Sequence, residues 1–190
     1  MQFVQRAVQM LVFLFLISCG GSDDSDPPQT TFDGSRPSLS EFYSESQLVA
    51  TESLGFLLNF GDDPPDVEGS FRIDPVVLQA SSISDDAFGV GNTDVPFNLT
   101  FSDQDENSLT IDVDMGTDLI EVTSAVISGS GNAFTVFAMT LVPAISEESR
   151  MALSGNLTEF GIENFQYAPF VVGSEDIRPF EDQDNLSERL

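Results

Sequence analysis

Oxygen-bearing side chains recur in the segment 103–114 at intervals suited to binding a cation. Asp103, Asp105 and Asn107 stand at its first, third and fifth places, and Asp114 stands at its twelfth. Carboxylate and amide oxygens are the ligands that Ca²⁺ prefers in proteins. The chemistry open to this segment is therefore calcium binding, and calcium is the cofactor that these residues suggest.

This spacing resembles the calcium-binding loop of the EF-hand family, with Leu109 at the place of the carbonyl ligand. Three features depart from the family pattern. Ser108 stands where the loop has a glycine, Asp114 replaces a bidentate glutamate, and the flanking residues have the period of strands where helices belong. The alternative interpretation is a solvated hairpin turn followed by the outward face of a strand.

Asp112 and Asp114 are two residues apart, so in a strand they lie on the same face. Two carboxylates that close are stabilised by a cation or an arginine between them. Arg72 lies within a strand-like pattern and Arg150 begins another, so each is a candidate partner. A structural ion pair is the expected role of both arginines.

The chain lacks the residues that most catalytic mechanisms require. It has no His and one Cys, which removes the imidazole base of a serine or cysteine nucleophile and the His ligands of zinc or copper. It also has no nucleophile-elbow, phosphate-loop or dinucleotide motif. We therefore expect a non-catalytic protein. A glycan hydrolase that uses two carboxyl groups is kept as an alternative, although no pair stands out among 32 acids.

The chain is strongly acidic, with a net charge of −26 at pH 7. Such a surface repels nucleic acid and anionic lipid head groups. Nucleic acid is therefore an unexpected partner, whereas cations and cationic peptides are compatible with this charge.

Alternation of apolar and polar residues predicts an all-β fold. The clearest case is the segment 109–115, which follows 97–101 and predicts a hairpin. Residues 119–128 and 133–142 form a second predicted hairpin, and 151–157 and 164–172 form a third. With earlier candidates this gives seven to eight strands, typical of an antiparallel β-sandwich or a small up-and-down β-barrel.

The earlier part of the domain has weaker signals. Residues 38–54 have rough helical spacing, and Ser38 or Ser40 is a candidate cap for a short helix. Residues 56–60 and 69–80 are candidate strands. Since proline lacks the amide proton of a central ladder, Pro75 predicts an edge strand or a bulge there.

The N-terminus has the pattern of an export signal. An apolar run at 7–17 follows Arg6 and is too short to cross a bilayer as a helix. It ends in Leu16-Ile17-Ser18-Cys19, which resembles the lipobox of bacterial lipoproteins. The resemblance implies cleavage after residue 18, a lipid on Cys19, and a membrane as partner. Gly20, in place of the Asp that signals inner-membrane retention, implies the outer membrane of a Gram-negative cell.

These features divide the chain into a signal peptide at 1–18, a flexible tether at 19–37, a β-rich domain at 38–173 and an acidic tail at 174–190. The tail is expected to be mobile or a loosely docked short helix.

The expected function is that of a cell-envelope lipoprotein that binds an envelope protein or a small apolar ligand, or has a structural role. A calcium-dependent binding module and a glycan hydrolase are the alternatives.

Overall fold

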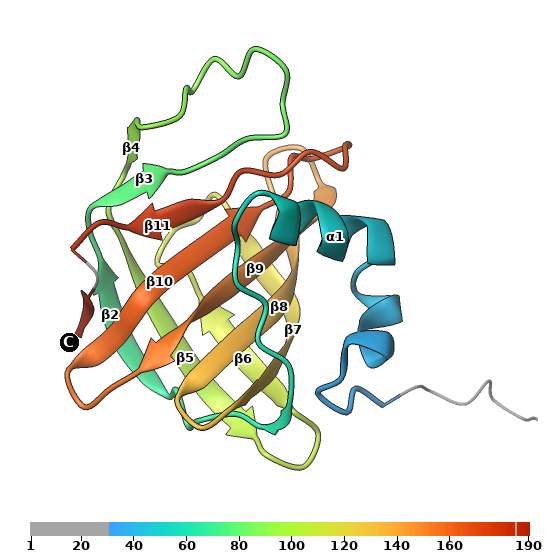
Figure 1. Cartoon of the computed structure of the whole chain (residues 1–190), viewed down its shortest axis with the longest axis vertical. Helices are drawn as coiled ribbons and strands as arrows, with labels where there is room; N and C mark the ends of the chain where they lie inside the picture. Colours follow the sequence, from blue (N-terminus) through green and yellow to red (C-terminus); the bar gives the residue numbers. More distant parts are fainter. Residues whose placement is uncertain (1–30, 185) are drawn as a thin grey trace, which may run out of the picture.

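The chain folds into a closed antiparallel barrel of eight strands, seen in Figure 1. The computed structural model describes residues 31–184 and 186–190. In ring order the barrel strands are β2 (Gly69–Ile73), β5 (Phe97–Asp105), β6 (Thr110–Asp114), β7 (Glu121–Ser130), β8 (Ala133–Val142), β9 (Glu147–Leu157), β10 (Gly161–Pro169) and β12 (Leu186–Arg189). Because β12 pairs with both β10 and β2, the ring is closed. Of the two architectures expected from the sequence, the barrel is the one that forms.

In the described part of the chain, four short strands and two helical segments lie outside this ring. Strands β11 (Phe180–Asp182), β3 (Val76–Leu78) and β4 (Thr93–Asp94) extend the sheet from β10, and β1 (Asp62–Asp63) pairs in parallel with β7. The helical segments are η1 (Arg36–Glu41) and α1 (Glu45–Ser53). The segment 79–92 between β3 and β4, named the flap here, is the long green loop at the top of Figure 1.

The three predicted hairpins are confirmed as β5–β6, β7–β8 and β9–β10. In β6 the exposed and buried residues alternate strictly, as the sequence pattern predicts. In β8 both faces are buried: Phe134 points into the barrel, and Phe137 lies under α1 on the outside. Covering the outer face of β8 with α1 explains why this strand is apolar on both sides.

Side chains fill the interior of the barrel. Four fully buried phenylalanines lie within it, namely Phe71, Phe101, Phe134 and Phe165. An eight-stranded barrel has room for such packing and little more. Any sizeable ligand site must therefore lie at an end of the barrel or on its wall.

Two expectations about the N-terminal part are wrong in detail. The helix begins later than Ser38 or Ser40, because Ser44 forms a capping box with Gln47. Residues 56–60 form no strand. The Asn59 side chain donates hydrogen bonds to the Phe134 carbonyl oxygen (3.0 Å) and to Ser154 Oγ (3.0 Å), so side-chain bonds hold this segment on the barrel.

The edge strand or bulge expected at Pro75 does not form, because Pro75 lies in a break between two strands that each have a partner on both sides. The peptide bond between Asp74 and Pro75 is cis, and Pro75 separates β2, which lies in the barrel, from β3, which lies outside it.

The acidic segment 174–190 is neither a mobile tail nor a docked helix, because it contains β11 and β12. Some of its polar groups form hydrogen bonds inside the fold: Ser187 donates to the buried carboxylate of Asp182 (2.7 Å), and the main-chain amide of Asp184 donates to the same group (3.1 Å). Burial raises the pKa of Asp182 above its usual value. The folded part of the chain thus extends past residue 173.

Replacement of Gly161 by Ala is expected to open the barrel between β10 and β12. Gly161 has a φ of +153°, and a Cβ there would lie 2.1 Å from the Ser187 carbonyl oxygen. We expect a loss of about 3 kcal/mol or more in the free energy of unfolding, measured by urea denaturation. Gly131→Ala is the matched control, since Gly131 also has a positive φ (+61°) but a Cβ there would have no neighbouring atom within 4 Å. Equal losses in the two variants would contradict the closure by β12.

Candidate functional site

A cavity of about 650 Å³ opens at one end of the barrel. This end, named the mouth here, is where β6, β8 and β10 finish and β5, β7 and β9 begin. The larger apolar side chains around the cavity are Phe88, Phe97, Met115, Met151, Tyr167 and Phe180. A volume of this size suits a small organic molecule.

Aromatic rings pack together to form one side of the mouth. Tyr167 stacks on Phe180 with ring centroids 4.7 Å apart, and Phe97 meets Tyr167 edge to face at 5.4 Å. Phe88, from the flap, meets Phe180 edge to face at 5.7 Å. Because each ring fixes its neighbour, the apolar surface exists before any ligand arrives.

One polar pair lies within this apolar surface. The hydroxyl of Tyr167 donates a hydrogen bond to Asp94 Oδ2, and Asp94 Oδ1 accepts from the amide of Val95 (2.8 Å). Burial raises the pKa of Tyr167 above its usual value, and the neighbouring Asp94 carboxylate raises it further. Tyr167 is therefore a neutral donor, and Asp94 offers acceptor capacity to a ligand.

The lip of the mouth exposes apolar side chains to solvent. Val95 is 76% exposed and Leu119 is 73% exposed, and both line the cavity. Arg72 lies at the same lip, where it forms an exposed ion pair with Asp74 (3.3 Å). The lip is thus mainly apolar, with its cationic group already paired.

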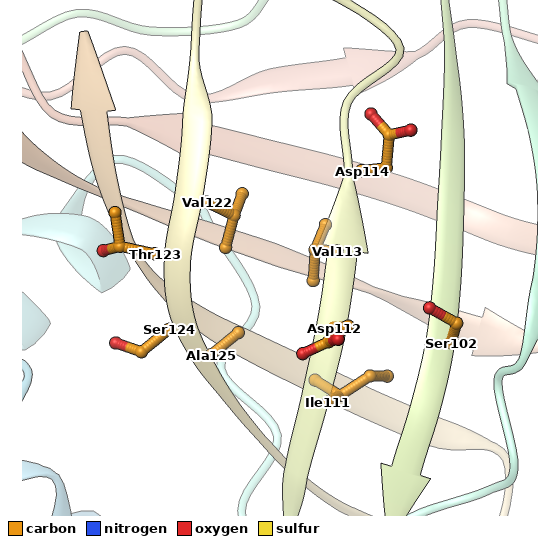
Figure 2. A pocket seen from close by; sticks show the side chains of 9 residues that line it. All are labelled: Ser102, Ile111, Asp112, Val113, Asp114, Val122, Thr123, Ser124 and Ala125. Atoms are coloured by element: carbon orange, nitrogen blue, oxygen red, sulfur yellow. The ribbon is translucent and has the colours of Figure 1, made fainter. Parts of the chain in front are cut away.

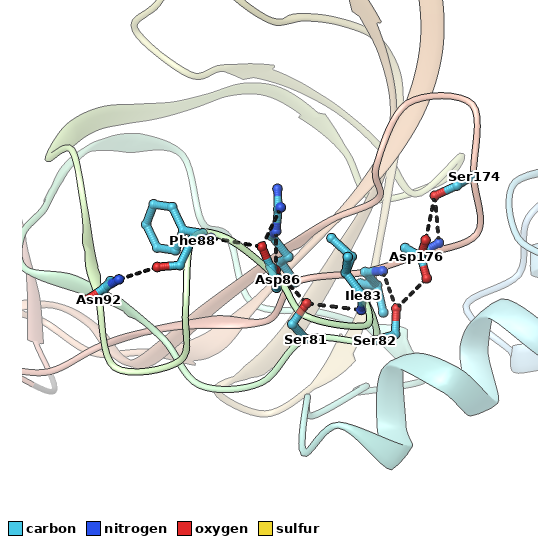
Figure 3. Close-up of polar contacts among 10 residues, drawn as sticks. Ser81, Ser82, Ile83, Asp86, Phe88, Asn92, Ser174 and Asp176 are labelled. Atoms are coloured by element: carbon cyan, nitrogen blue, oxygen red, sulfur yellow. Dashed lines mark hydrogen bonds and ion pairs between the residues drawn. The ribbon is translucent and has the colours of Figure 1, made fainter.

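An ion pair fastens the flap beside the cavity, in the region drawn in Figure 3. The Asp86 carboxylate accepts from Arg178 Nε (2.7 Å) and Nη2 (2.8 Å), from Ser81 Oγ (2.6 Å) and from the amide of Phe88 (3.0 Å). The Asp86 side chain is 6% exposed. The Arg178 guanidinium holds the pKa of Asp86 well below its usual range, and Ser81 lowers it further.

A second contact ties the flap to the segment before β11. Ser82 Oγ donates to Asp176 (3.1 Å), as Figure 3 shows. The same oxygen accepts from the main-chain amide of Ile177 (2.9 Å). The two contacts hold the flap at the position that places Phe88 against Phe180.

The four predicted calcium ligands do not converge on one point. Asp105 accepts hydrogen bonds from the main-chain amides of Asn107 (2.7 Å) and Ser108 (3.3 Å). These bonds lower the pKa of Asp105, and the one from Asn107 has the largest effect. Asp114 lies at the far end of β6 and accepts from the amide of Gly116 (2.7 Å).

The remaining parts of the predicted calcium loop also have local roles. Asp103 lies in an irregular stretch of β5, with a φ of 50°. The Leu109 carbonyl oxygen accepts from the amide of Ile127 (2.8 Å). Within residues 31–184 and 186–190, no three or more acidic or Cys side chains form a group that could hold a metal ion. This hairpin has the geometry of the alternative interpretation, a polar turn leading into a strand.

The two candidate arginine partners lie elsewhere. Arg72 pairs with Asp74, and Arg150 Nε donates to the Phe42 carbonyl oxygen. Neither forms an ion pair with Asp112 or Asp114 within the described part of the chain. The expected ion pair is therefore confirmed for Arg72, with a different partner, and is wrong for Arg150.

Cys19 and the whole lipobox lie outside the described residues, so their assignment stays a prediction. Over the residues that the structure describes, no helix has the length and apolar character needed to cross a membrane.

Together, fold and cavity define a closed eight-stranded barrel with an apolar mouth covered on one side by a fastened flap. Comparison of the chain with protein-family models, with curated proteins and with solved structures found no match.

Sequence reasoning missed the residues of the mouth. Asp94, Tyr167 and Phe180 are far apart in the chain, and they meet only because β4 and β11 are added beside β10. The abundance of Phe, 17 residues against no Trp, was the available signal, and it predicts an apolar interior without locating a cavity.

Removal of the Asp86 charge is expected to release the flap. In Asp86→Asn at pH 7, we expect amides of residues 79–92 to exchange at least about tenfold faster with deuterium, because the paired carboxylate is lost. Asp85→Asn, an exposed neighbour with the same change of charge, is the control.

The pH dependence of this effect follows from the lowered pKa of Asp86. The stabilisation by the ionised group is complete above the unfolded pKa of about 3.9 and is lost as the pH falls below it towards the folded pKa. The stability difference between the wild type and Asp86→Asn should therefore shrink below about pH 4. A difference that stays constant down to pH 2 would contradict this assignment.

Proposed function

We propose that this chain is a non-catalytic, lipid-anchored binding protein of the bacterial cell envelope that holds a small, mainly apolar ligand in its mouth. The observation that carries the proposal is the preformed cavity of about 650 Å³ between the aromatic rings and the exposed apolar lip. Clefts of this volume with few polar groups are typical of small-molecule sites.

The polar groups of the mouth indicate the chemistry of the ligand. Asp94 is the one carboxylate among the residues found to line the cavity, and Arg72 and Arg178 are each paired with another acid. A ligand with an apolar body and one hydrogen-bond donor or cationic group fits this arrangement. An anionic ligand is disfavoured by Asp94 and by the net charge of −26.

A binding role is preferred over hydrolysis because of the residues available. Glycan hydrolysis needs two carboxyl groups on opposite sides of the scissile bond. The lining of the mouth supplies Asp94 alone. The chain also has no His to act as a general base.

The envelope location rests on the lipobox-like Leu16-Ile17-Ser18-Cys19. A lipid on Cys19 would place the barrel beside a membrane at the end of the short polar segment 20–30, close to a source of apolar ligands. Gly20 favours the outer membrane by the same resemblance.

Ligand capture is testable by photolabelling with an uncharged alkyl diazirine on the full chain in nonionic detergent. We expect labelled peptides to include Met115 and Met151, and labelling there to fall at least about tenfold in the double variant Val95→Arg, Leu119→Arg, which adds charge to the apolar lip. Both positions are exposed, so the fold should tolerate the changes.

The matched control is Phe160→Arg, at an equally exposed site (68%) in the turn at the opposite end of the barrel. Its labelling should equal that of the wild type. Labelling spread over the surface, or unaffected by the lip variant, would contradict a ligand site at the mouth.

Anchoring is testable by expression in a Gram-negative host with labelled palmitate. The wild-type chain is expected to incorporate label and to fractionate with membranes, whereas Cys19→Ser should do neither, since the thiol is the site of lipid attachment. Ser22→Ala is the control. Label retained by Cys19→Ser would refute lipidation at this residue.

A further inference from the structure

Among the described residues, the shortest ladder in the barrel wall is the one between β6 and β7, and this junction is named the seam here. The two strands pair through Thr110 opposite Val126, with one further bond from the Ile127 amide to the Leu109 carbonyl oxygen (2.8 Å). By contrast, β7 and β8 pair from Ser130 and Ala133 to Glu121 and Leu141. Figure 2 shows the residues on both sides of the seam.

The seam leaves two facing strand edges available. Residues 112–114 pair with β5 on one side, and residues 121, 122, 124 and 125 pair with β8 on the other. No ladder pair joins these two stretches, all of whose residues the structure describes. Unpaired edges present amide and carbonyl groups that can pair with another strand.

Two hollows lie along the seam and continue the mouth. The inner one has a volume of about 310 Å³ and shares Val113, Asp114 and Val122 with the outer one, of about 400 Å³. The outer hollow in turn shares Met115 and Ile120 with the cavity at the mouth. The result is a groove, named the slot here, that runs from the mouth to Ile111 and Ala125.

The walls of the slot have an alternating pattern. Ile111 and Val113 face the core and are at most 9% exposed, whereas Asp112 and Asp114 face outwards and are exposed. At the outer end Asp118 and Glu121 add two further carboxylates. A strand inserted here would therefore meet apolar groups on one face and acidic groups on the other.

We propose that the slot binds an extended, basic peptide segment of a partner protein, which adds a strand between β6 and β7. Main-chain hydrogen bonds to both edges would hold the peptide, its apolar side chains would point inwards, and its Lys or Arg side chains would face Asp112 and Asp114. This site is separate from the ligand cavity of the proposed function, although it opens into it.

The chemistry of the slot favours this occupant over others. A second copy of this chain, with a net charge of −26, would be repelled by the acidic rim. An acyl chain would cover the apolar wall but would leave the main-chain groups of both edges without partners. A basic peptide meets both requirements.

The test uses a fluorescent eight-residue peptide with alternating Lys and Val and the full chain in nonionic detergent. Fluorescence anisotropy is expected to give saturable binding. A peptide of the same composition with all Lys before all Val, and a peptide N-methylated at alternate residues, should each bind at least tenfold more weakly. Equal binding of all three peptides would overturn the proposal, because it would show charge attraction without strand pairing.

Protein variants locate the site. Asp112→Asn with Asp114→Asn should weaken binding at least tenfold, whereas Asp103→Asn with Glu106→Asn, which removes two charges from β5 and its following turn, should have little effect. In the complex, amides of residues 111–114 and 121–125 should become protected from deuterium exchange, and those of β9 should not change. Absence of this protection would overturn strand addition.

The outcome is independent of the ligand test. The double variant Val95→Gln, Leu119→Gln, which makes the lip polar without adding charge beside the slot, should keep its peptide binding while its photolabelling at the mouth falls. Loss of both activities in this variant would show one shared site and would overturn the separation of slot and cavity.

Discussion

Pairing of β12 with β2 on one side and β10 on the other joins the two ends of a sheet that would otherwise have free edges. The approach is close: the main chain of β12 passes Gly161, where even a methyl group would overlap with the Ser187 carbonyl oxygen. Once the ring is closed, the phenylalanines inside it are fully buried, and each contributes about 2 kcal/mol by leaving water. The position of the mouth follows from the same closure, because β11, which carries Phe180, directly precedes β12.

Because side chains fill the interior of the barrel, a ligand has room only at its end or on its wall. In this chain the end is widened by the strands added beyond β10 and is bounded by the flap. The flap has little apolar contact of its own apart from Phe88, so its position depends on Asp86, Arg178 and Ser82. Ion pairs and hydrogen bonds of this kind hold the flap in the folded state but can open locally at low cost. A segment beside the proposed ligand site needs that property.

The sequence predicts the regular part of this fold well. Strict alternation in 109–115 predicts β6, and the turn at Gly131 and Asn132 predicts the β7–β8 hairpin. Pairing between strands that follow one another can be predicted from nearby residues. Closure of the ring, which distinguishes a barrel from a sandwich, depends on strands that are distant in the sequence. Strand β12 is short and mainly polar, with the sequence Leu-Ser-Glu-Arg. It is held by backbone pairing and by the side chains of Ser187 and Arg189, so hydropathy carries no sign of its role.

Site prediction fails for a related reason. The calcium hypothesis treats residues 103–114 as one loop, yet the chain reverses direction between Asp105 and Thr110, and Asp114 then lies a strand length from the turn. Residues of the mouth, such as Asp94 and Tyr167, are brought together from strands that are distant in sequence. Spacing along the chain is informative only where the backbone between the residues is a single turn or element.

The carboxylates of β6 have a different environment in the fold from the one that the sequence predicts. The sequence pattern predicts a cation or an arginine between Asp112 and Asp114. In the fold, these two carboxylates lie on the outer side of the seam, where β7 diverges from β6. Charges on strand edges commonly prevent unwanted pairing with other chains. Here they repel further copies of this acidic chain, and the same charges attract a basic strand, so the rim can select its partner while the open main-chain groups supply the binding energy.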